Sequence, residues 1–172
     1  MGDRRDEAAN HLATYLRDHR AGAAGGLSLI RRSAKANAGT ALGRLLDELH
    51  GEISADCSTL EDVMGRLGVR PNPVKTWLAP IAEGLRRVKV NRHPLRYSAL
   101  DKVVELELLA SAIDAKRNLW RALSVVAEHD RRLGADHMRR MIERSAAQHA
   151  RVLEAHPSVA AEAFVASDGE PR

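Results

Sequence analysis

The sequence predicts an all-α protein, a four-helix bundle with one long crossover between its second and third helices. Apolar residues recur at helical spacing over four long stretches, and no stretch alternates as a strand would. Aromatic residues make up only 3% of the chain, which favours an aliphatic core of closely packed helices. The connections between the stretches are short, long and short. The 172 residues suit a single domain over 1–172.

The first two helices are expected over about residues 7–37 and 40–67. Gly39 is a plausible stop for the first helix, and Thr40 a reasonable N-cap for the second. Gly68 follows the second helix at the position where a left-handed residue commonly ends a helix. The sequence "VRPNP" then forbids continuation.

The third helix is expected over about 99–129 and the fourth over about 136–155. Ser98 and Asp101 form a loose capping box at the start of the third helix. The dipeptide His156-Pro157 is expected to interrupt the fourth, with a short helix after it and a frayed tail over about 165–172.

The crossover, about 70–97, is strongly basic and is expected to contain a short amphipathic helix. It holds seven Lys or Arg and one acid, a balance of +6 on a chain whose net charge is +4. Such a segment can neutralise phosphates. This favours an alternative function, a binding module that contacts an acidic partner or nucleic acid. The candidate anion-binding residues are Arg86, Arg87, Lys89, Arg92 and Arg96.

Each helix also directs at least one titratable side chain inward when residues are placed at 100° intervals. Because burying an unpaired charge costs several kcal/mol, these groups are expected to meet. Asp56 in particular is expected to contact His19, Glu105 or His149. The candidate set is His19, Glu52, Asp56, Glu105 and His149.

Three glycines in "RAGAAGGL" stand one turn beyond His19. Each weakens the helix by about 1 kcal/mol relative to alanine. Gly22 and Gly26 share the apolar face of the first helix, four residues apart. The pair is expected to let a neighbouring helix approach closely.

The segment "EISADCSTLEDVMGRLG", residues 52–68, resembles the second-helix signature of the ferritin-like superfamily, in its small bacterial stress-associated branch. The matching positions include Glu52, Glu61 and Gly68, whereas Asp56 stands where that branch has histidine. The resemblance implies a four-helix carboxylate protein that binds iron or a related metal. The chain departs from it because Glu-x-x-His occurs nowhere, and Ser145 replaces an acid four residues before His149.

Two interpretations of the inward polar set follow. In the first, the metal centre is vestigial and a buried polar network replaces it, so no cofactor is bound and no reaction is catalysed. In the second, the set holds one Fe, Mn or Zn ion. No nucleotide-binding or hydrolase motif appears, which argues against other enzymatic chemistry.

The remaining expectations concern location and assembly. A single cysteine, Cys57, suits a reducing compartment, and no apolar stretch has the length of a membrane span. The charged N-terminal residues show no apolar signal core. We therefore expect a cytoplasmic protein that forms homo-oligomers.

Overall fold

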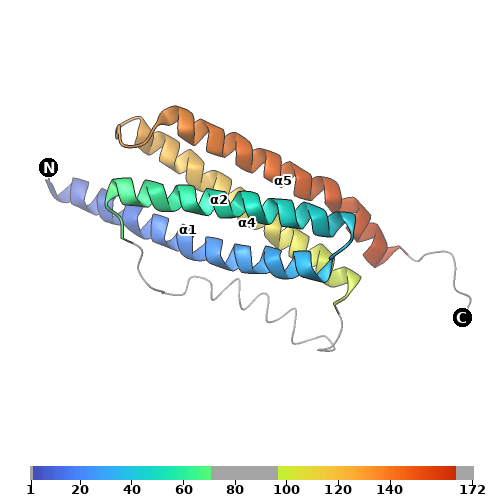
Figure 1. The fold of residues 1–172 in the computed structure, drawn as a ribbon. Helices are drawn as coiled ribbons and strands as arrows, with labels where there is room; N and C mark the ends of the chain where they lie inside the picture. Colours follow the sequence, from blue (N-terminus) through green and yellow to red (C-terminus); the bar gives the residue numbers. More distant parts are fainter. Residues whose placement is uncertain (1, 71–96, 166–172) are drawn as a thin grey trace, which may run out of the picture.

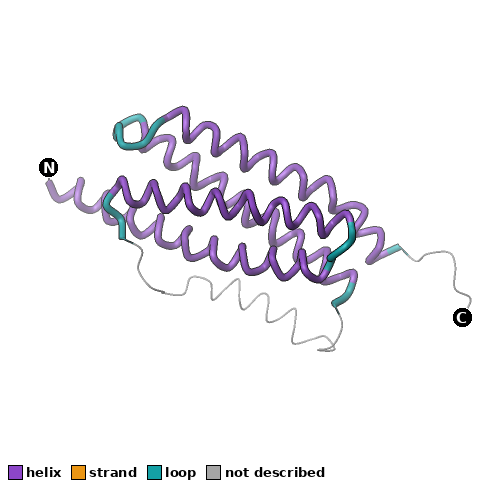
Figure 2. The backbone as a smooth tube through the Cα atoms, in the orientation of Figure 1, coloured by secondary structure: helices purple, strands orange, loops and turns teal. Residues whose placement is uncertain are grey.

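The computed structural model describes residues 2–70 and 97–165, and these form a four-helix bundle (Figure 1). The helices are α1 (Gly2–Ala36), α2 (Ala41–Leu67), α4 (Ala99–Ala127) and α5 (Ala135–Phe164). The described residues contain no strand (Figure 2). The predicted fold class is confirmed.

Neighbouring helices run antiparallel, and α1 packs against α2 and α4, while α5 packs against α4 and α2. Contacts at the bundle ends fix these directions. Arg17 Nε on α1 donates to the carbonyl of Arg70, just beyond α2. Tyr97, just before α4, meets Asn37 at the other end of α1. The connection from α2 to α4 therefore starts at one end of the bundle and finishes at the other.

The sequence signals for the helix ends are confirmed where the structure describes them. Thr40 caps α2 by accepting a hydrogen bond from the Gly43 N–H, and Gly68 ends α2 in the left-handed conformation at φ 73°. Ser98 and Asp101 form the full capping box at the start of α4. The predicted crossover helix and tail fall largely in 71–96 and 166–172, outside the described residues.

Two helix bounds differ from the prediction. Helix α1 begins at Gly2 rather than near residue 7. Helix α5 continues through Pro157 to Phe164, although proline removes one helical hydrogen bond and usually costs about 3 kcal/mol. The reason is packing: Val152 and Val159 are both buried in one core cluster, so burial on both sides of Pro157 offsets the loss.

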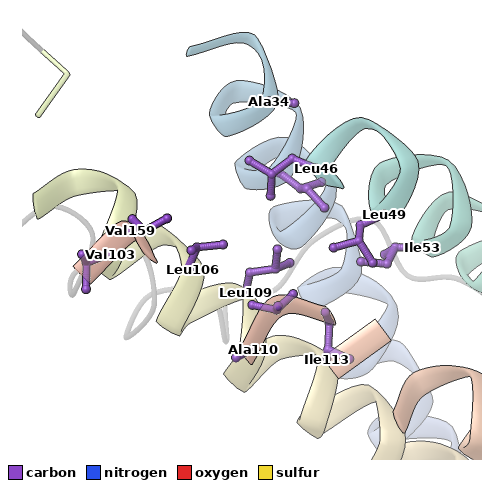
Figure 3. Close-up of a cluster of buried hydrophobic side chains, with 12 residues drawn as sticks. Ala34, Leu46, Leu49, Ile53, Val103, Leu106, Leu109, Ala110, Ile113 and Val159 are labelled. Atoms are coloured by element: carbon purple, nitrogen blue, oxygen red, sulfur yellow. The ribbon is translucent and has the colours of Figure 1, made fainter. Parts of the chain in front are cut away.

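The core consists of two apolar clusters, one toward each end of the bundle. The first joins Leu46 and Leu49 of α2 to Leu106 and Ile113 of α4 (Figure 3). The second is centred on Trp120 and its neighbours, including Leu16, Met64, Leu123 and Met138. Between the two lies a layer of polar side chains, of which Asp56 and Gln148 are fully buried, and this layer holds the candidate site.

Candidate binding site at the middle of the bundle

Asp56 is the centre of the polar layer. Its side chain is fully buried, at 0% exposure, so the prediction that it points inward is confirmed. The Lys116 ammonium on α4 donates to Oδ2 of Asp56 and to the side-chain oxygen of Gln148 on α5. Gln148 donates its amide to the same Oδ2 at 3.1 Å. Asp56, Lys116 and Gln148 thus join three helices.

Two arginines of α5 connect this centre to the surface. Arg144 Nε lies 3.1 Å from Asp56 Oδ1, an ion pair whose angles do not make a hydrogen bond. Arg151 donates to Glu52 and to Glu48, each at 2.6 Å. Gln148 also donates to Glu52, at 3.1 Å. The layer therefore pairs three carboxylates with three cations: Glu48, Glu52 and Asp56 with Lys116, Arg144 and Arg151.

Burial and pairing act in opposite directions on these groups. Burial lowers the pKa of Lys116 and outweighs the opposing attraction of Asp56. Burial alone would raise the pKa of Glu52, but hydrogen bonds from Arg151 and Gln148 bring it below its ordinary value. The Glu52 carboxylate is therefore charged at neutral pH.

A pocket of about 390 Å³ lies beside the polar layer, on the side of α1. Its described lining comes from residues 19–29 of α1, 53–60 of α2 and 108–120 of α4. Most of these side chains are apolar or small, whereas Asp56, Lys116 and His19 contribute polar groups. A largely apolar cavity of this size with few polar groups is typical of small-molecule sites.

The glycine run of α1 lines this pocket, through Gly22, Gly25 and Gly26. A Cβ placed on Gly26 would meet nothing within 4 Å, apart from its own helix and chain neighbours. The expectation that Gly26 serves a close helix approach is therefore wrong. Its missing side chain leaves space at the middle of the bundle instead.

His19 also lines this pocket, one turn before the glycines. Its ring meets that of Tyr15 edge to face, with centroids 4.5 Å apart. Burial lowers the pKa of His19 more than the nearby Asp18 raises it. The imidazole is therefore predominantly neutral at pH 7.

The structure separates the other predicted site residues from Asp56. Glu105 accepts from the Tyr97 hydroxyl at 3.0 Å and lies 3.5 Å from Arg32. It stands eleven residues before Lys116 on α4, about 16 Å away along the helix. His149 is half-buried and adjacent to Gln148, which takes the fully buried position.

The expected contact of Asp56 with His19, Glu105 or His149 is therefore replaced by contacts with Lys116, Arg144 and Gln148. Within 2–70 and 97–165, no three His, Cys, Asp or Glu side chains gather where they could hold a metal ion. The predicted anion-binding residues, from Arg86 to Arg96, lie outside the described residues, and that function stays a prediction.

Comparisons with known proteins add no identification, because no family model, curated protein or solved structure matches this chain significantly. Among the described helices, none combines the length and apolar character needed to cross a membrane.

Proposed function

We propose that this chain is a ferritin-like bundle without enzymatic activity, in which a charge-balanced polar layer replaces the metal centre. The observation that carries the proposal is the Lys116 ammonium, bound by both Asp56 and Gln148 inside the bundle. This ammonium supplies the positive charge that a metal ion would supply to inward carboxylates. The order of short, long and short connections supports the ferritin-like part.

The donor chemistry of the polar layer does not fit a di-iron centre. Such a centre needs carboxylates that are free to bridge cations and histidines that approach the same point. Here each carboxylate of the layer already contacts a cationic side chain, and Gln148 occupies the inward position next to His149. An added divalent cation would be repelled by Lys116 and Arg144.

Metal analysis tests this proposal directly. Protein purified without chelator and exposed to Fe(II), Mn(II) or Zn(II) is expected to carry no stoichiometric metal after desalting, measured by plasma mass spectrometry. Lys116→Met removes the internal cation, so any gain of metal binding in that variant supports the role assigned to the ammonium. Two iron ions per chain would contradict the proposal. So would one ion that is lost in both His19→Ala and Glu105→Ala.

The proposal includes assembly of the bundle with copies of itself. Leu153 and Phe164 on α5 are 50% and 64% exposed. They stand eleven residues apart, which places them about 20° from each other around the helix. They also lie about 16 Å apart along the helix, so the proposed contact runs along one face of α5.

Sedimentation analysis should therefore give a mass that is a multiple of the 18.8 kDa chain. The double variant Leu153→Lys with Phe164→Lys is expected to shift the protein to the monomer. Val125→Lys is the matched control, since Val125 is 58% exposed but lies on α4. A monomeric wild-type protein at micromolar concentration would remove this part of the proposal, and the metal-free centre would still stand.

A further inference from the structure

We propose that the mid-bundle pocket binds a small, neutral, largely apolar molecule that carries one hydrogen-bond acceptor, such as a carbonyl oxygen. This assigns a binding site beyond the proposed scaffold function. It rests on the pocket of about 390 Å³ and on the spare hydrogen-bond donor of Lys116, which lines it.

The donor is the Lys116 ammonium, which has three N–H groups. Two of them bond to Asp56 and Gln148. The third has no hydrogen-bond partner among residues 2–70 and 97–165, and Lys116 lines the pocket. The spare group is a donor, so the ligand needs an acceptor.

The charge of the layer selects a neutral ligand. The charged side chains that line the pocket, Asp56 and Lys116, already pair with each other, and the lowered pKa of His19 leaves its imidazole neutral. A ligand carboxylate would therefore bring an uncompensated charge into a partly dehydrated space. A carbonyl accepts the same hydrogen bonds without this penalty.

The volume indicates the ligand size. A cavity of about 150 Å³ lined by apolar side chains holds one benzene molecule. The pocket here is more than twice as large, so a two-ring molecule fits. The apolar walls favour hydrocarbon around the single acceptor.

Calorimetric titration of the full chain with three two-ring probes tests the proposal. The probes are 1-tetralone, with a carbonyl; tetralin, its hydrocarbon counterpart; and 1,2,3,4-tetrahydro-1-naphthoate, an anion. Tetralone is expected to bind about five- to tenfold more tightly than tetralin, the effect of one hydrogen bond. The anion is expected to bind no better than tetralin.

Three variants locate the binding. Gly26→Leu places a side chain in the open space of the pocket and should abolish binding of all three probes. Gly51→Leu is the matched control, because Gly51 also has open space at its Cβ but is exposed on α2, away from the pocket. Lys116→Met removes the donor, while Arg144 still lies beside Asp56, and should reduce the advantage of tetralone over tetralin by severalfold.

The possible results separate clearly. Absence of tetralone binding at millimolar concentration would overturn the proposal, as would unchanged binding in Gly26→Leu. Equal affinities for tetralone and tetralin would overturn the role of the Lys116 donor, and strongest binding by the naphthoate would overturn the preference for a neutral ligand. None of these results alters the expected metal content, so they are distinguishable from failure of the proposed function.

Discussion

Replacing Asp56 with alanine is expected to lower the free energy of unfolding by about 3–5 kcal/mol. Asp56 is the fully buried acceptor for Lys116 and Gln148. The substitution leaves a buried ammonium with one partner fewer, and uncompensated charges in the interior are strongly destabilising. Chemical denaturation followed by helical circular dichroism measures the change.

Two comparisons separate the loss of the pair from a general effect of the substitution. Glu61→Ala removes an α2 carboxylate that is 50% exposed and pairs with Arg20, so its cost should stay below about 1 kcal/mol. The double variant Asp56→Leu with Lys116→Met removes both charges of the pair. It should recover much of the stability that Asp56→Leu alone loses. A loss under about 1 kcal/mol for Asp56→Ala would mean that water reaches this side chain.

The sequence was sufficient to predict the fold, the helix caps and the inward position of Asp56. It was misleading for α4 and α5, for a geometric reason. The prediction placed residues at 100° intervals, which corresponds to 3.6 residues per turn. Helices that pack around each other in a bundle repeat their inward positions every 3.5 residues. The predicted inward face therefore departs from the true one by about 20° for every seven residues. Over the 29 residues of α4 the error reaches about 80°.

A strict alternation of three- and four-residue steps identifies the residues that were missed. On α4 the inward series is Leu106, Leu109, Ile113, Lys116, Trp120 and Leu123. On α5 it is Met138, Met141, Ser145, Gln148 and Val152. Lys116 and Gln148 are each in register with buried neighbours, although lysine is rarely buried and therefore suggests a surface position.

The pocket could not be predicted from the glycines. A glycine on an inward face permits two outcomes, a close helix contact or an open space. Which one occurs depends on the separation of the helix axes, and the side chains along the full length of the neighbouring helices set that separation. At Gly26 the outcome is open space. At Gly43 it is a close contact, tighter than at any other described glycine for which the surroundings of an added Cβ are known.

These two glycines should respond to alanine with opposite signs. At Gly43 a Cβ would lie 2.1 Å from the Asn37 carbonyl oxygen and 2.8 Å from its carbon, so the backbone itself would have to move. That carbonyl also accepts from the Thr40 hydroxyl at 2.7 Å, and the Asn37 amide is bonded to Tyr97 at 2.9 Å. The turn between α1 and α2 therefore has little freedom to adjust.

Gly43→Ala is accordingly expected to destabilise the protein by about 1–3 kcal/mol or more, despite the better helix propensity of alanine. Gly26→Ala meets open space and should instead raise the free energy of unfolding by up to about 1 kcal/mol. Denaturant unfolding of both variants beside the wild type measures the two changes. A stabilised Gly43→Ala would show that α1 and α2 lie farther apart at this turn, and a destabilised Gly26→Ala would show that another helix closes the space beside α1.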